Sequence, residues 1–243
     1  MTDVKIPMTI EGKLFYHSTT EGALRNIQSV QYRPLFMPEI IDARIAADDT
    51  SPLWMNGLTA MSVSVTGKTK GGKAVVVYAH VPHYFSNPEN VANTVKAGLT
   101  NGAGPYDAVD FRRLLDLQDD KTVFVVDYST LKTSVSGTIE VSEALKHPQV
   151  IPFLGGKERA EAYLEKHAKV VGDKIGIFHT DLAKKPLGSM LFVNDRYDSG
   201  FLGHLVEIGL KNYGPFVGVP VSTADAVKKT GSLDSAQFLG GSK

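Results

Sequence analysis

A valine-rich stretch in the first third of the chain constrains the fold more than any other feature. Thr59–Thr66 (TAMSVSVT) partly alternates between apolar and polar residues, and Lys73–Val81 (KAVVVYAHV) is rich in valine. Two such runs joined by a short glycine-rich segment are typical of a β-hairpin. The joining segment, GKTKGG, also carries lysine, so we predict an antiparallel pair of strands with Lys68, Lys70 and Lys73 exposed at the tip.

Short helices and strands are interspersed along the rest of the chain. Helices are expected over Thr20–Ser29, Asn90–Ala97, Tyr106–Leu117, Val141–Lys146 and Lys157–Lys169, and further strands over Lys13–Ser18, Thr122–Asp127, Lys174–His179 and Ser189–Val193. Tyr32–Ser51 is expected to be irregular because Pro34 and Pro38 interrupt it. No strict βαβ rhythm is present, so we predict the α+β class, with a mixed or antiparallel sheet, a prominent β-hairpin and several short helices.

Two of these helices carry patterns that predict which side chains face the core. Lys157–Lys169 should bury one apolar face and expose two carboxylates, with Ala160, Tyr163 and Leu164 inward and Glu161 and Glu165 outward. By the same periodicity, Tyr106–Leu117 should bury Val109, Leu114 and Leu117.

The composition narrows the class of protein. The 243 residues are 42% hydrophobic and 21% charged, which is typical of a folded globular chain. The absence of cysteine excludes disulfides, zinc–thiolate sites, iron–sulfur clusters and cysteine nucleophiles. Lysine plus arginine and aspartate plus glutamate number 26 each, and a net charge of zero argues against nucleic acid as a partner.

The chain is expected to form a single globular domain over residues 1–243. A shift in composition near Leu187 is also compatible with a small C-terminal unit over 187–243. Met1–Ile10 has no long apolar run, and no segment reaches the roughly 20 apolar residues of a membrane span, so neither a signal peptide nor a membrane segment is expected. The expected location is therefore the cytoplasm, or an assembled particle. A homo-oligomer or larger assembly is the expected partner under the structural-protein hypothesis given below.

Several patterns suggest ligand sites but also have structural explanations. Gly67–Lys73 has the spacing of a phosphate-binding loop, but Ala74 follows it and the next segment is a strand, which favours a hairpin tip. His80 and His83 could belong to a metal site, but residues three apart on a strand point to opposite faces, so no metal is assigned. Glycines beside aromatic residues in Phe192–Val219 indicate tight turns and close backbone packing.

The segment Tyr16–Thr19 (YHST) carries a family resemblance. A strand ending in Tyr-His-x-Thr, followed by a helix of the form xxALxxI, resembles the opening of histidine-class ADP-ribosyltransferases. The resemblance implies that a histidine and a hydroxyl hold the nicotinamide ribose and amide of NAD, and that a tyrosine stacks on the nicotinamide ring. It also implies a glutamate that stabilises the ribosyl cation as nicotinamide leaves.

The residues that the resemblance implies are His17 and Glu140 (with Glu143 as its substitute) as catalytic groups, and Thr19 with either Tyr78 or Tyr84 as NAD-binding groups. The segment YHST also has a structural explanation. In that explanation Tyr16 and His17 pack at a strand end, and Ser18–Thr20 cap the next helix.

Three classes of function therefore stay open. NAD-dependent transfer of ADP-ribose is the enzymatic hypothesis, and it rests on YHST and on the order of His17, a tyrosine and Glu140. Neutral charge, abundant glycine and proline, and the absence of a clear catalytic motif fit a structural or assembly protein, such as a virion or particle component or a self-associating scaffold. The glycine-rich loops, including Leu99–Pro105, also fit a small-ligand binding module.

Overall fold

The computed structural model describes residues 2–6, 10–178, 185–195, 205–208, 210 and 214–221. The strands are β1 (Thr2–Ile6), β2 (Ile10–Phe15), β3 (Tyr32–Pro34), β4 (Leu58–Lys68), β5 (Ala74–Ala79), β6 (Gly104–Pro105), β7 (Val123–Asp127), β8 (Gly137–Glu140), β9 (Lys174–Phe178), β10 (Leu187–Val193), β11 (Leu205–Ile208) and β12 (Phe216–Pro220). The helices are α1 (Thr20–Ser29), α2 (Met37–Ala46), α3 (Pro52–Met55), a 3₁₀ turn η1 (Tyr84–Ser86), α4 (Pro88–Ala97), α5 (Ala108–Asp116), α6 (Tyr128–Lys132), α7 (Val141–Ala144), α8 (Val150–Leu154) and α9 (Lys157–Val170).

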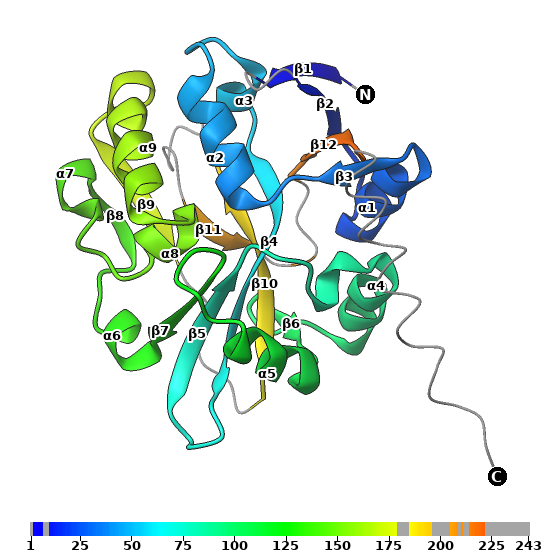
Figure 1. Ribbon diagram of the computed structural model, residues 1–243, viewed down its shortest axis with the longest axis vertical. Coiled ribbons are helices and arrows are strands. Elements are labelled where there is room, and N and C mark those ends of the chain that lie inside the picture. The colour runs from blue at the N-terminus through cyan, green and yellow to red at the C-terminus, as the bar shows by residue number, and fades with distance from the viewer. Residues whose placement is uncertain are drawn as a thin grey trace.

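The strands form one mixed sheet through the centre of the molecule (Figure 1). Their order is β1-β2-β12-β4-β10-β11-β9-β8, with β3 on β12, β5 on β4, β7 on β5 and β6 on β10. Most neighbours are antiparallel, whereas β11–β9 and β12–β4 are parallel. This mixed sheet with short helices around it confirms the predicted α+β class.

Two hydrophobic cores lie on opposite faces of the sheet. Helices α2, α8 and α9 contribute to one core, and α1, α4 and α5 contribute to the other (Figure 1). Along β5, Val76 and Tyr78 belong to the first core, whereas Val75, Val77 and Ala79 belong to the second, as the alternation of a strand requires. Because helices cover both faces, the central strands are buried on both sides.

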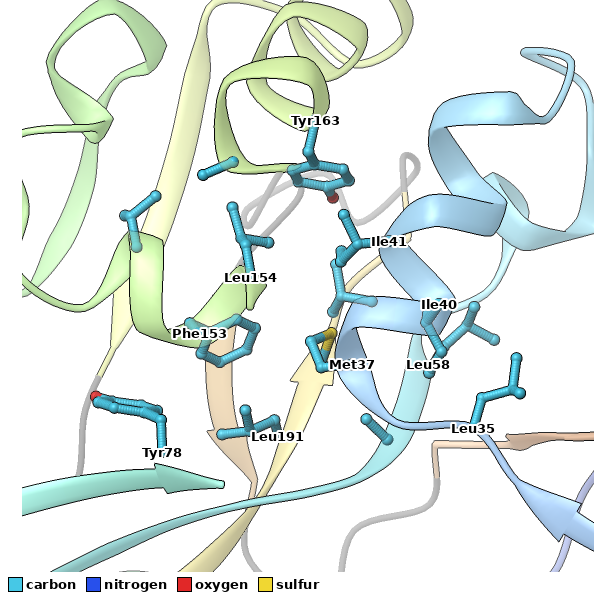
Figure 2. Packing of buried hydrophobic residues seen from close by; sticks show 14 of the residues in the cluster. Leu35, Met37, Ile40, Ile41, Leu58, Tyr78, Phe153, Leu154, Tyr163 and Leu191 are labelled. Atoms are coloured by element: carbon cyan, nitrogen blue, oxygen red, sulfur yellow. The ribbon is translucent and has the colours of Figure 1, made fainter. Parts of the chain in front are cut away.

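The first core is closed by three helices that pack against the sheet. Figure 2 shows Phe153 and Leu154 of α8 and Tyr163 of α9 around Met37 of α2, with Leu191 of β10 below them. All five side chains are fully buried. Burial of a side chain of this size contributes about 1.5–3 kcal/mol, so this core is a major source of stability.

The predicted hairpin is confirmed. Strands β4 and β5 pair antiparallel, with Lys68 opposite Ala74 at the closed end, and Lys68, Lys70 and Lys73 are exposed. The segment with phosphate-loop spacing is the tip of this hairpin, and a strand rather than a helix follows it.

The expectation that Tyr32–Ser51 is irregular is wrong. This segment contains β3 and the ten-residue helix α2. Pro34 is the last residue of β3, and Pro38 lies in the first turn of α2, where the missing N–H of proline removes no hydrogen bond within the helix. The prolines therefore mark the boundaries of two elements.

Helix α5 forms where predicted, but with a different buried face. Phe111 and Leu114 are buried, whereas Val109 is 66% and Leu117 is 44% exposed. Asp107 caps the helix, and Phe111 shares a face with Leu114 because three residues separate them. The predicted burial of Val109 and Leu117 is therefore wrong.

Helix α9 confirms its predicted face, since Ala160, Tyr163 and Leu164 are buried and Glu161 and Glu165 are exposed. Within the described part of the chain, no helix combines the length and apolarity needed to cross a bilayer.

Candidate functional site

Phe192, near the end of β10, is partly buried and lies against two glycines. A Cβ on Gly57 would lie 2.3 Å from Phe192 Cζ, and a Cβ on Gly214 would lie 2.5 Å from Phe192 Cε2. Glycine at both positions therefore lets the aromatic ring approach the backbone closely. Any larger residue at either position would displace the ring.

An irregularity in the sheet determines where Phe192 lies. Met190 pairs with Val63, but Phe192 pairs with Thr59, so two steps along β10 match four along β4. Bulges of this kind redirect side chains and are frequent beside functional sites. Beyond the bulge, the Thr59 N–H donates to the Pro215 carbonyl at 2.9 Å, which joins β4 to the chain leading into β12.

Polar side chains lie at Gly57 and at the residue before it. The same Cβ on Gly57 would lie 3.1 Å from Asn194 Oδ1, and Asn194 Oδ1 accepts a hydrogen bond from the Asp195 N–H at 2.9 Å. The hydroxyl of Tyr16, which is 51% exposed, donates to Asn56 Oδ1 at 3.0 Å. Partial burial raises the pKa of this hydroxyl, so it stays protonated and able to donate. We call Tyr16, Asn56, Gly57, Phe192, Asn194 and Gly214 the Phe192 surface.

A buried arginine contacts the backbone of this surface. Arg44 of α2 is fully buried, and its Nη2 donates to the carbonyls of Asn56 at 2.9 Å, Asn194 at 2.9 Å and Val193 at 3.3 Å. The surface is therefore tied to the interior of the molecule at two separate segments.

A cavity of about 340 Å³ opens between the start of α1 and α4. Val91, Val95 and Leu210 supply its apolar part, and Thr19 and Lys96 belong to its polar part. The size is that of a small-molecule site. The cavity includes one of the sequence-predicted residues, Thr19.

The first part of the predicted NAD site lies at the beginning of α1. Thr19 caps this helix, because its Oγ1 accepts from the Gly22 N–H at 3.1 Å. The Thr19 N–H donates to His17 Nδ1 at 3.1 Å, and both residues are exposed. Thr19 therefore has the capping role of the structural explanation.

The other predicted residues lie on separate elements. Tyr78 is fully buried in the first core, where Figure 2 labels it. Tyr84 is half-buried, and its ring packs against Tyr106 with centroids 5.5 Å apart. Glu140 is exposed at the end of β8, and five strands lie between β8 and β2 in the sheet order. Its predicted substitute, Glu143, is exposed and pairs with Lys146 at 2.6 Å.

His80 and His83 are buried, and each makes hydrogen bonds within the protein. His80 Nε2 lies 2.9 Å from the Pro152 carbonyl, and its Nδ1 lies 2.8 Å from Ser62 Oγ. His83 Nε2 lies 2.8 Å from the Met61 carbonyl.

Each imidazole uses its two ring nitrogens in these contacts, since His83 Nδ1 also accepts from the Phe85 N–H at 3.2 Å. Burial lowers the pKa of both side chains to about 4, although the carbonyl that each contacts opposes this shift. Among the described residues, no group of three or more His, Cys, Asp or Glu side chains could hold a metal ion.

Sequence reasoning did not identify the Phe192 surface as a site. The available signal was the occurrence of glycines beside aromatic residues in Phe192–Val219, which correctly indicated close backbone packing. That signal contains Phe192 and Gly214 but not Gly57, which comes from the turn before β4. Only the fold brings the second glycine to the ring.

Comparison with known proteins gives a family for the chain. No family model matches it, and no curated protein matches it. A solved structure from Nanoarchaeota, in which the C-type lectin fold accommodates massive sequence variation, is 50% identical to this chain. It superposes with a TM-score of 0.81 and covers 88% of this chain and 100% of its own.

This relationship overturns the resemblance to histidine-class ADP-ribosyltransferases, and with it the predicted NAD-dependent transfer of ADP-ribose. The alternative of a structural or assembly protein gains no support from it. YHST is too short to define a family, because the need to cap a helix after a strand produces the same residues. With half of the residues identical across seven-eighths of its length, the chain belongs to the C-type lectin fold family.

Proposed function

We propose that this protein is a binding protein, in which a C-type lectin fold presents the Phe192 surface to a partner. The observation that carries this proposal is the 50% identity over 88% of the chain to a C-type lectin fold protein that accommodates massive sequence variation. A scaffold that tolerates such variation suits recognition of a partner, because recognition depends on exposed side chains whereas folding depends on buried ones.

The Phe192 surface has features that suit recognition. A partly exposed aromatic ring supplies apolar contact area and loses little conformational freedom on binding, because it has only two rotatable side-chain bonds. Gly57 and Gly214 confine the ring further, so less entropy is lost when a partner covers it. Asn194 supplies a polar group beside Gly57, and Tyr16 supplies another through its hydrogen bond to Asn56, so polar groups accompany the apolar ring on this surface.

The residues that hold the fold together are different from the exposed side chains of this surface, so the exposed side chains can vary in sequence. The two cores and Arg44 are buried, whereas Tyr16 is half-exposed. Exposed side chains away from special backbone positions change stability by only about 0.5 kcal/mol when substituted. The outward side chains of the surface could therefore differ between related proteins without loss of the fold.

The zero net charge favours a partner other than nucleic acid, because no overall positive field is present to attract phosphate. The same neutrality suits contact with a protein or a glycan, for which apolar and hydrogen-bonding contacts dominate.

The test is a binding screen with the purified full chain against arrays of proteins and glycans, followed by affinity measurements on any ligand found. Phe192→Ser should lower the affinity by at least about tenfold, because it removes the central anchor. Val109→Ser is the matched control, since Val109 is a 66% exposed apolar residue on α5. It should leave the affinity unchanged.

Circular dichroism and thermal melts establish that both variants are folded. Equal affinity for Phe192→Ser and the unaltered chain would reject the site. Absence of any saturable ligand on either array would reject the function.

A further inference from the structure

Arg44 is the exception to the rule that charged side chains remain in contact with water. Among the described lysine, arginine, aspartate and glutamate residues, it alone is buried, with none of its surface exposed. No carboxylate in the described part of the chain pairs with it. A buried cation without a counter-charge is costly, so its contacts must compensate and must serve a purpose that an apolar residue could not.

The guanidinium is satisfied by carbonyl oxygens and one hydroxyl. Nε donates to the Leu53 carbonyl at 2.9 Å, and Nη1 donates to the Tyr163 hydroxyl at 3.2 Å. Nη2 faces the carbonyls of Asn56, Val193 and Asn194, as described above. The planar fork of arginine can reach acceptors in several fixed directions at once, which a lysine ammonium on a flexible stem cannot do.

Trp54 completes the arrangement. The guanidinium carbon of Arg44 lies 5.1 Å from the centre of the Trp54 ring, and Trp54 Nε1 donates to the Arg44 carbonyl at 3.0 Å. Trp54 also stacks on Tyr163, with ring centroids 5.7 Å apart and an interplanar angle of 8°. The guanidinium is thus held from one side by an aromatic ring while its N–H groups point to the backbone acceptors.

The acceptors bracket the Phe192 surface. Asn56 immediately precedes Gly57, one of the two glycines against the aromatic ring, and Val193 immediately follows Phe192. Arg44 lies 149 residues from Val193 in the sequence, so it joins the N-terminal and C-terminal parts of the fold at this point. The chain has no cysteine, so no disulfide can join these two segments, and the hydrogen bonds of Arg44 connect them instead.

We infer that Arg44 is the positioning residue of the Phe192 surface: it holds the backbone on both sides of the ring, and so fixes the glycine platform and the aromatic anchor relative to each other. The inference rests on the proposed function only in treating this surface as a binding site. Whether Arg44 positions the backbone is tested without any ligand. Failure of that test would leave the binding experiment with Phe192→Ser untouched.

The test compares Arg44→Lys with the unaltered full chain by hydrogen exchange under native conditions. Lysine keeps the charge but loses the fork, so the amides of Leu58, Thr59 and Val193 should exchange at least about tenfold faster. The amides of β5, in the middle of the sheet, should change by less than about twofold. Tyr163→Phe is the matched control, because it removes one acceptor of the guanidinium but none of the carbonyls that bracket the surface, so it should accelerate the Leu58, Thr59 and Val193 amides much less than Arg44→Lys does.

Two outcomes would overturn the inference. Equal acceleration of the Leu58, Val193 and β5 amides would show that Arg44 only stabilises the whole fold. Unchanged rates at Leu58 and Val193 would show that it positions nothing.

If Arg44→Lys does not fold, native-state exchange of the unaltered chain in low urea gives the decision. Met55, on the segment that Arg44 contacts through Leu53 and Asn56, and Val193, which no strand pairing joins to it, should then open together with one free energy and one dependence on urea. Independent opening of the two amides would contradict a shared clamp.

Discussion

Acid should unfold this protein through two buried histidines before its carboxylates titrate. Burial lowers the pKa of His80 and His83 to about 4 in the folded chain, whereas an unfolded chain titrates histidine near its ordinary value of about 6.5. Between these values the unfolded state binds protons that the folded state does not bind. The contribution of these two histidines to the free energy of unfolding is therefore constant above about pH 7 and falls as the pH drops from about 6.5 to 4.

The magnitude follows from the size of the shift. One pKa unit corresponds to about 1.4 kcal/mol, so each histidine should lower the free energy of unfolding by about 2.5 kcal/mol between pH 7.5 and 4.5. Hydrogen bonds from Ser129 and Lys73 lower the pKa of Asp127 to about 2, so this carboxylate titrates below the histidine range. Carboxylates with lowered pKa lose their contribution as the pH falls below their ordinary values of about 4–4.5, so losses between pH 6.5 and about 5 report on the imidazoles.

The assay is urea unfolding at half-unit steps from pH 4.5 to 8, for the unaltered chain and for His80→Gln and His83→Gln. Below pH 6.5, the slope of the unfolding free energy against pH should be smaller in each variant by about 1.4 kcal/mol per pH unit, because glutamine does not titrate. Slopes are compared rather than absolute free energies, since either substitution also disturbs packing. Identical slopes in the variants and the unaltered chain would refute the assignment of neutral buried imidazoles.

Further outcomes follow from the packing. Leu164→Ala should lower the free energy of unfolding by about 2–5 kcal/mol in chemical denaturation, because Leu164 is 4% exposed in the first core; a change below about 0.5 kcal/mol would show that the buried face of α9 is assigned wrongly. Gly57→Ala should cost about 1–3 kcal/mol and alter the environment of Phe192, since the added methyl meets the ring. Gly71→Ala at the hairpin tip is its control, because the nearest atom there is 3.8 Å away, and it should change stability by less than about 0.5 kcal/mol.

Local patterns in the sequence predicted much of the fold. The hairpin of β4 and β5 was predictable because valine runs and a glycine-rich turn lie next to each other in the chain. The cap of α1 at Thr19 was predictable for the same reason, since a hydroxyl before a helix has a specific local role. Pro38 gave a misleading signal, because a proline interrupts a helix in its interior but is tolerated in its first turn.

The Phe192 surface could not be predicted in this way. Its ring, its two glycines and Arg44 come from segments far apart in the sequence, and each of them alone has an ordinary explanation. In the sequence, a glycine that leaves room for a distant aromatic ring cannot be distinguished from a glycine in a turn. Likewise, Arg44 on α2 resembles a surface arginine until the fold shows which carbonyls surround it.

Local sequence patterns also did not identify the family. YHST matched the opening of another family over a few residues, whereas the relationship to the C-type lectin fold extends over most of the chain. Short motifs that double as strand ends and helix caps are weak evidence for function, because their structural role alone explains them.

We expect the partner to be bound at the Phe192 surface. The most direct measurement is a hydrogen-exchange footprint of the full chain with and without the ligand found in the array screen. We expect slower exchange at residues 56–59, 192–195 and 214–216, and unchanged exchange in α7 and α9. Protection confined to the cavity between α1 and α4, with none around Phe192, would contradict this expectation.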